Sequence, residues 1–63
     1  MKNNIGAILR VKGISIRRLS RLWNKPYAYT YNLVTRDDVS SITIGTLQEL
    51  ADLLRVDVTD LYK

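Results

Sequence analysis

The most informative chemical feature of this sequence is the uneven distribution of its charged residues. Residues 1–36 carry eight Lys or Arg and no Asp or Glu, whereas residues 37–63 hold all six acidic residues beside Arg55 and Lys63. The two parts therefore have formal charges of +8 and −4, which sum to the net +4 of the chain. A purely basic segment concentrates positive potential and attracts polyanions over about 8 Å in physiological salt. Nucleic acid is the partner class that this pattern favours.

Arg17 and Arg18 are the cations that protein stability alone explains least well. The helix expected after Ser15 would hold both in its first turn, where a cation opposes the helix dipole at roughly 0.3–1 kcal/mol. A bound phosphate would make the two arginines favourable at this helix end, because the phosphate would contact backbone N–H groups, the positive end of the dipole and both guanidinium groups. The pair therefore predicts a phosphate contact, with solvated surface charge as the alternative. Other cations of this part, Arg10, Lys12 and Arg21, are typical of exposed helix faces.

Catalytic or metal-binding chemistry finds little support in the sequence. There is no Cys and no His, so carboxylates are the only good metal ligands. No acid–base pair and no couple of nucleophile and base stands out, and we expect neither an enzyme nor a bound metal or cofactor. The acidic residues expected at helix ends or on polar helix faces are Glu49, Asp52, Asp57 and Asp60.

Length and hydropathy indicate one small domain and no membrane segment. At 63 residues the chain is expected to bury only about 60% of the surface that its unfolded form exposes. No apolar run reaches the roughly 20 residues that span a bilayer, and Met1-Lys2-Asn3-Asn4 is not followed by the apolar segment of a signal peptide. We expect a cytoplasmic protein.

Apolar residues recur at helical spacing through nearly the whole chain and predict four or five short helices. The first is expected from about Asn4 to Lys12, capped by an Asn and ended by Gly13 in a left-handed conformation. The second follows Ser15 and ends at Asn24, since Asn tolerates positive φ better than other non-glycine residues.

Local sequence signals indicate where three further helices begin. Pro26 opens a third helix, because its missing N–H costs nothing in a first turn. Thr43 caps a fourth helix, Ile44 to Leu54, and Asp57 caps a last short turn with Asp60 at its third position. The apolar stripes expected to form the core are Ile5, Ile8 and Leu9; Ile16, Leu19, Leu22 and Trp23; Ile44, Leu47, Leu50, Ala51 and Leu54; and Val58 and Leu61.

The segment from Ile16 to Thr35 has the frame of two helices that cross closely at a tight turn. A small residue, Ser20, stands at the crossing, Asn24 stands at the turn, and the packing positions hold Leu19, Trp23 and Leu33. This frame resembles the helix-turn-helix of the phage Cro/C1-type repressor family, called XRE-like in bacteria. The resemblance continues through residues 43–47 and 56–62. It implies an all-α, compact five-helix lambda-repressor-like helix-turn-helix domain over residues 1–63, with the helix-turn-helix at about 16–35 and the recognition helix at about 26–35.

Three departures from the family pattern bear on the same region. Lys25 and Thr30 stand where the family prefers apolar residues, and the loop between Leu33 and Ile44 is slightly longer than usual. Both affect the expected tilt of the recognition helix. Arg18 stands where the family commonly places a Glu that completes a capping box, which adds to the expectation of a phosphate contact.

The resemblance implies that the recognition helix contacts bases through the face opposite Thr30 and Leu33. Asn32 is the side chain there that can pair bidentately, and its amide matches adenine N6 and N7 in the major groove. No Arg or Lys stands there for guanine, which favours A·T pairs. Tyr29 lies off this face and is equally compatible with packing on the domain. The base-reading residues expected are Tyr27, Ala28, Tyr31, Asn32 and Thr35, and the phosphate-binding ones Arg17, Arg18, Lys25 and Arg36.

These features predict a sequence-specific double-stranded DNA-binding transcription regulator, repressor-like, nucleoid-associated and of phage or mobile-element origin. A homodimer on a palindromic site is an expected partner arrangement, because so small a domain needs a two-fold partner for useful affinity. The alternative is a protein-interaction module such as an antirepressor or adaptor, since Tyr is enriched at protein interfaces. The residues that either form a dimer patch or complete the core are Val39, Ile42, Val58 and Tyr62.

Overall fold

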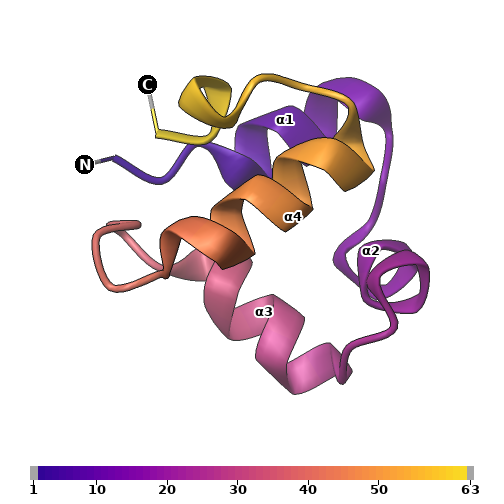
Figure 1. Cartoon of the computed structure of the whole chain (residues 1–63). Coiled ribbons are helices and arrows are strands. Elements are labelled where there is room, and N and C mark those ends of the chain that lie inside the picture. Colours follow the sequence, from indigo (N-terminus) through magenta and orange to yellow (C-terminus); the bar gives the residue numbers. More distant parts are fainter. Residues whose placement is uncertain (1, 63) are drawn as a thin grey trace.

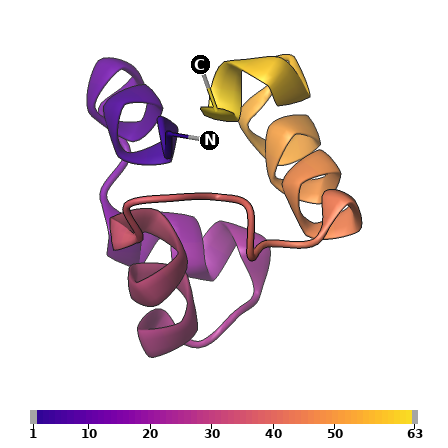
Figure 2. The same ribbon diagram turned by 90° about the vertical axis from the view of Figure 1, so that its left-hand side faces the viewer.

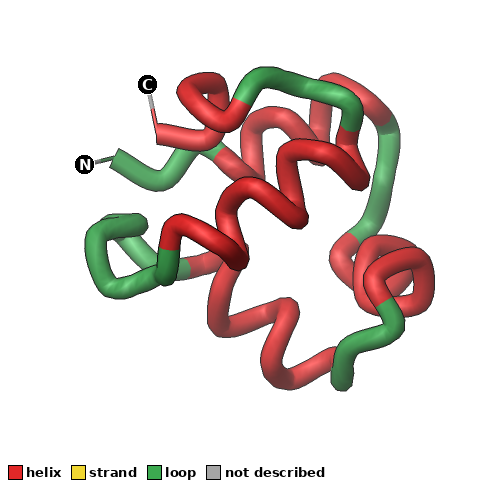
Figure 3. The backbone as a smooth tube through the Cα atoms, in the orientation of Figure 1, coloured by secondary structure: helices red, strands yellow, loops and turns green. Residues whose placement is uncertain are grey.

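Four α-helices and one 3-10 helix make up the fold (Figure 1). The structure is a computed structural model and describes residues 2–62. Within these residues the only strand-like pairing is an isolated antiparallel bridge between Lys2 and Asp38, and Figure 3 shows helices joined by loops. The helices are α1 (Ile5–Lys12), α2 (Ile16–Trp23), α3 (Tyr27–Thr35) and α4 (Ile44–Leu54), followed by the 3-10 helix η1 (Val58–Tyr62).

The expected fifth helix is not an α-helix. Its five residues form a 3-10 helix, whose hydrogen bonds close over three residues rather than four. Asp57 and Asp60 favour this tight turn: Asp60 Oδ2 accepts the Asp57 N–H at 3.2 Å, and Asp57 Oδ1 accepts the Thr59 N–H at 3.1 Å. A segment this short cannot offset the cost of nucleating an α-helix. The predicted cap at Asp57 is confirmed, and the five-helix prediction is corrected to four α-helices and a 3-10 turn.

Most helix ends lie where local signals place them. Gly13 and Asn24 end α1 and α2 in the left-handed region, with φ of 68° and 59°. Ser15 and Thr43 cap α2 and α4 through side-chain oxygens that accept a first-turn N–H at 3.0 and 3.2 Å. Arg55 also adopts a left-handed conformation, φ 58°, at the end of α4, and no sequence signal pointed to it.

Two asparagines hold the chain before α1. Asn4 directly precedes the helix, yet the Ile5 N–H is accepted at 3.0 Å by Oδ1 of Asn3 instead. Asn4 Nδ2 donates to the carbonyl of Asp60 at 2.9 Å and so ties α1 to η1. Asn3 Nδ2 lies within hydrogen-bond distance of three carbonyls at the end of α3, those of Leu33 at 3.0 Å, Val34 at 3.2 Å and Arg36 at 2.8 Å.

The core takes side chains from every helix and from the loop between α3 and α4. Val39 and Ile42 of this loop are buried, so these two complete the core and form no dimer patch. Val58 and Tyr62 pack against it while partly exposed. The buried apolar residues are Ile5, Leu9, Leu19, Trp23, Leu33, Val34, Val39, Ile42, Leu47, Leu50, Ala51, Leu54 and Leu61.

Two residues predicted to be in the core lie outside it. Leu22 is 53% exposed and Ile44 is 73% exposed. The buried residues of α2 are Leu19, Ser20 and Trp23, and because successive residues of an α-helix are about 100° apart, Leu22 lies outside the face that these three share. Ile44 is the first residue of α4 and precedes the first buried residue of that helix by almost a full turn.

The elements divide between two ends of the molecule. Figure 2 shows α2 and α3 together at one end and α1 with η1 at the other, while α4 runs between them. The loop after α3 passes back across the domain to reach α4 (Figure 2). The helix pair expected to meet a polyanion therefore lies away from η1, while Asn3 of the N-terminal segment reaches the end of α3.

Candidate nucleic-acid interface

A turn of three residues, Asn24, Lys25 and Pro26, joins α2 to α3. The N–H of Lys25 donates to the Ser20 carbonyl at 3.0 Å, which folds the turn back onto α2. At the crossing, the Ser20 hydroxyl donates to a carbonyl one turn earlier at 2.6 Å. Thr30 is fully buried and donates to the Pro26 carbonyl at 3.2 Å. The two buried polar side chains, Ser20 and Thr30, therefore have hydrogen-bond partners within the helix-turn-helix itself.

One face of α3 is open to solvent. Thr30, Leu33 and Val34 point into the core, and the remaining side chains of the helix are exposed. The prediction that one set of α3 residues shares an exposed face is confirmed for its exposure; their contact with bases stays a prediction. The set is Tyr27, Ala28, Tyr31, Asn32 and Thr35.

Asn32 and Thr35 differ in what they can offer a ligand. Within residues 2–62 the Asn32 side chain makes no hydrogen bond, so its amide keeps both a donor and an acceptor for a base edge. The Thr35 hydroxyl donates to the Tyr31 carbonyl at 2.7 Å and can therefore only accept from a ligand. Asn32 is the better equipped of the two for bidentate pairing.

Arg17, Tyr27 and Tyr31 form a stack that the sequence did not indicate. The Arg17 guanidinium carbon lies 5.0 Å from the Tyr27 ring centroid, and the Tyr27 and Tyr31 rings stack at 6.0 Å with 30° between their planes. An exposed cation–π contact of this kind contributes about 0.5–1 kcal/mol. The stack places a cation of α2 against the first turn of α3.

The first turn of α2 retains free backbone donors. Ser15 accepts the Arg18 N–H at 3.0 Å, whereas the N–H groups of Ile16 and Arg17 have no carbonyl partner within the helix. Arg18 stacks on no ring among the described residues, in contrast to Arg17. An anion at this helix end would therefore contact two backbone N–H donors and the Arg18 side chain, which stacks on no described ring.

Lys25 lies beside a second aromatic pair. Its Nζ is 5.9 Å from the Trp23 ring centroid and 6.0 Å from that of Tyr29, and the two rings are 5.8 Å apart at 56°. Tyr29 thus packs on the domain while 42% exposed. The Trp23 side chain is buried, as predicted, and its Nε1 donates to Glu49 Oε1 at 2.7 Å. This bond connects α2 to α4 across 26 positions of sequence and had no local signal.

Arg36 closes the far end of α3. Its Nη1 donates to Ser41 Oγ at 3.0 Å, which holds the side chain near the following loop. Lys25 precedes the nine-residue α3 and Arg36 follows it, so about 14 Å of helix separates the two cations. The four residues expected at phosphates, Arg17, Arg18, Lys25 and Arg36, are all exposed.

Three acidic residues accept hydrogen bonds that hold the fold. Glu49 accepts from Trp23, and Asp57 and Asp60 accept backbone N–H groups of η1. Within residues 2–62 no three His, Cys, Asp or Glu side chains are grouped so that they could hold a metal ion. Nor does any helix of that part of the chain have the length and hydropathy needed to cross a membrane.

Two short helices joined by a three-residue turn, with the second exposing one polar and aromatic face, define a helix-turn-helix domain of the DNA-binding class. The sequence profile of the Cro/C1-type HTH DNA-binding domain matches residues 4–63, and the chain belongs to this family. No curated protein and no solved structure matches the chain. The family and the fold together support a DNA-binding regulator with double-stranded DNA as its partner.

Proposed function

We propose that the chain is a repressor-like regulator of transcription, of phage or mobile-element origin, which binds specific sites in nucleoid DNA through α3 in the major groove. The observation that carries this proposal is the exposed face of α3, with an unpaired Asn32 amide at its centre and cations at both ends. Cations flanking a helix fix its position on the phosphates, and the side chains between them select the bases.

In this proposal the α3 side chains contact bases and the flanking cations contact phosphates. Asn32 pairs with adenine N6 and N7, while Ala28 and the two tyrosine rings contact thymine methyl groups. The site is therefore centred on A·T pairs. Two copies related by two-fold symmetry occupy the halves of a palindrome, which raises the affinity above that of one small domain. The cations on phosphates are Arg17, Arg18, Lys25 and Arg36.

Selection of bound duplexes from a randomised pool tests this proposal. We expect an enriched site with two-fold symmetry and A·T pairs in each half. Enrichment of a single, unrepeated half would refute the two-fold arrangement. Binding without any enrichment would refute sequence-specific recognition while leaving general DNA binding intact.

A protein-interaction module is the second candidate, and the stacked rings of Tyr27 and Tyr31 favour it. These side chains are 43% and 47% exposed, and aromatic residues dominate many protein interfaces. On this alternative, Tyr27→Ala or Tyr31→Ala abolishes co-purification with a protein partner, and Asn32→Ala leaves any base preference unchanged. On the DNA-reading proposal, Asn32→Ala alters that preference.

A further inference from the structure

Two short polar side chains, Asn32 and Thr35, lie on the exposed face of α3. They stand three positions apart, so their Cβ atoms are about 5–6 Å from each other on one side of the helix. Successive bases along one strand of a duplex are about 3.4 Å apart. The two side chains are therefore spaced to contact the same base pair or two adjacent ones.

The Thr35 hydroxyl has a fixed hydrogen-bonding direction. Its oxygen lies 2.7 Å from the Tyr31 carbonyl oxygen, and because a carbonyl only accepts, the hydroxyl proton lies between the two oxygens. A ligand therefore contacts only the lone pairs of this hydroxyl. The base groups that donate in the major groove are the N6 amino group of adenine and the N4 amino group of cytosine. Thr35 is consequently suited to an amino group and unsuited to guanine O6 or thymine O4.

Asn32 requires an amino group for a different reason. Its amide makes no hydrogen bond within residues 2–62, so both its carbonyl oxygen and its NH₂ group are free for a base. Adenine offers a donor and an acceptor side by side, N6–H and N7, which pair with Oδ1 and Nδ2 of this amide. Asn32 and Thr35 thus both depend on an exocyclic N–H that points into the major groove.

The cations at the two ends of α3 are held by other contacts. Arg36 Nη1 donates to Ser41 Oγ at 3.0 Å, and Lys25 Nζ lies 5.9 and 6.0 Å from the ring centroids of Trp23 and Tyr29. Neither side chain is directed at guanine O6 and N7, the usual target of an Arg or Lys in the groove. Polar recognition by this face therefore rests on the amino groups of adenine and cytosine.

We infer that the chain binds its site only while the amino groups contacted by α3 are unmethylated. A paired adenine uses one N6–H for thymine, and its other N6–H points into the major groove. A methyl group on N6 replaces the second hydrogen while the base pair is kept, and a methyl group on cytosine N4 does the same. Either modification removes the donor that Asn32 or Thr35 accepts. The inference rests on the proposed function of α3 and adds to it a form of regulation.

Methyl transfer to an exocyclic amino group of DNA is the class of reaction that would control this binding. The amino nitrogen attacks the methyl carbon of a sulfonium donor, so that an N–C bond forms and the C–S bond breaks. The donor leaves as a neutral thioether, and the amino group loses one proton. Methylation of cytosine at C5 has the opposite expectation, because it leaves the N4–H in the groove and adds a methyl group of the kind that Ala28 and the tyrosine rings contact.

Binding of the whole chain to modified duplexes tests the inference, with the duplex enriched from the randomised pool as the probe. Each adenine of a half-site is replaced in turn by N6-methyladenine, and each cytosine by N4-methylcytosine or 5-methylcytosine. Amino methylation should raise the Kd about 5- to 150-fold at the adenine paired with Asn32, the range of one bidentate contact. At the base bonded to Thr35 the rise should be about 2- to 10-fold, the range of one hydrogen bond. 5-Methylcytosine should bind at least as well as cytosine.

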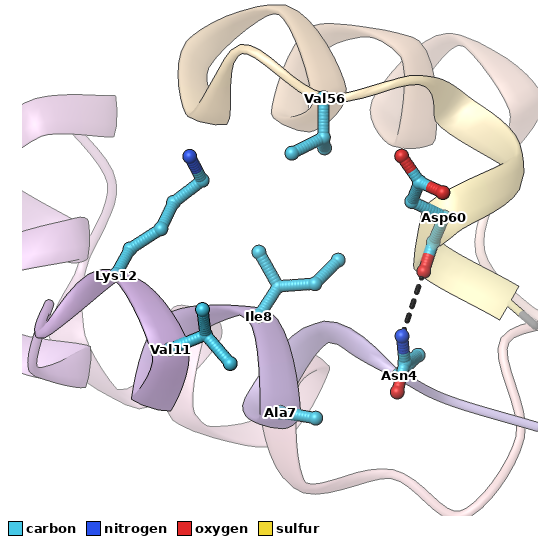
Figure 4. A pocket seen from close by; sticks show the side chains of 7 residues that line it. All are labelled: Asn4, Ala7, Ile8, Val11, Lys12, Val56 and Asp60. Carbon is cyan, nitrogen blue, oxygen red and sulfur yellow. Dashed lines mark hydrogen bonds between the residues drawn. The ribbon is translucent and has the colours of Figure 1, made fainter.

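Two variants identify the side chain behind each effect. Asn32→Ala and Thr35→Val should each weaken binding to the unmodified duplex and abolish the response to methylation at the one base that the side chain contacts. Val11→Thr is the matched control, since it makes the reverse exchange of methyl and hydroxyl on α1. Val11 is 87% exposed and lies near Val56, in the groove between α1 and the segment after α4 (Figure 4), and this variant should bind every duplex as the natural chain does. Thermal melts confirm that each variant is folded.

The possible outcomes separate this inference from the proposed function. Equal binding of the selected duplex with and without amino methylation would overturn the inference and leave the proposed function standing. A response to methylation that persists in both Asn32→Ala and Thr35→Val would also overturn it, because the methyl groups would then act through their bulk and not through a lost donor. Failure to enrich any duplex would refute the proposed function, and the inference with it.

Discussion

Arg17 and Arg18 are neighbours in the first turn of α2, yet the structure gives their removal different energetic consequences. Either cation opposes the helix dipole at roughly 0.3–1 kcal/mol. Arg17 recovers about 0.5–1 kcal/mol from its position 5.0 Å over the Tyr27 ring, and Arg18 has no ring partner among the described residues. Arg18→Ala should therefore stabilise the domain by about 0.3–1 kcal/mol, whereas Arg17→Ala should change its stability by less than about 0.5 kcal/mol.

Thermal unfolding at low ionic strength separates these two expectations. For a domain of this size 1 kcal/mol corresponds to roughly 4–8 °C in Tm, so Arg18→Ala should raise the Tm by about 1–8 °C. The Tm of Arg17→Ala should stay near that of the natural chain. Added salt should shrink the effect of Arg18→Ala, because the dipole interaction of an exposed cation is screened.

Binding to random duplex gives the second measurement. If each cation neutralises a phosphate, each substitution should flatten the plot of log K against log salt by about 0.9, and the double variant by about twice that. Unchanged slopes would remove both residues from the interface. Equal stabilisation by the two substitutions would show that the stack of Arg17 on Tyr27 contributes nothing in solution.

Three other substitutions probe the remaining features. Asn32→Ala should cost about 1–3 kcal/mol on the selected duplex and relax the preference at one base pair per half-site, with random-duplex binding as the control that should not change. Thr30→Val should leave stability in urea unfolding equal or higher by up to about 1 kcal/mol, because the Pro26 carbonyl keeps its bond from the Thr30 N–H; a loss above that size would contradict this account of the buried hydroxyl. Gly13→Ala should destabilise the domain by about 1 kcal/mol, since Gly13 has φ of 68° and a Cβ there meets strain rather than a clash; an unchanged urea midpoint would exclude that strain.

Helix boundaries were accessible from the sequence because their causes are local. Ser15 and Thr43 cap their helices with their own side chains, and Gly13 and Asn24 end theirs through their own backbone preferences. The left-handed Arg55 was not accessible, since its side chain has no preference for that conformation. The conformation lets the N–H groups of Arg55 and Val56 donate to carbonyls in the last turn of α4.

Burial depends on neighbours, and here the periodic pattern was a weaker guide. Leu22 and Ile44 fit apolar stripes at helical spacing but are exposed, because the pattern cannot say where the next helix crosses. The candidate site shows the same division. Helical geometry predicted which α3 residues share a face, and the family resemblance implied that this face is the exposed one. The contact of Arg17 with Tyr27 and the bond from Trp23 to Glu49 depend on how separate helices meet.

The amide of Asn3 has a consequence for anyone who would transplant α3 into another protein. The helix ends at an extended Arg36 rather than at a left-handed glycine, and its last carbonyls are met by a side chain from some 30 positions earlier. A copied segment of residues 24–36 would carry the base-facing surface but leave those carbonyls without their donor. A transplanted unit must therefore combine two separate parts of the sequence. These are α2, the turn and α3, together with the segment before α1 whose Asn3 donates to the last carbonyls of α3.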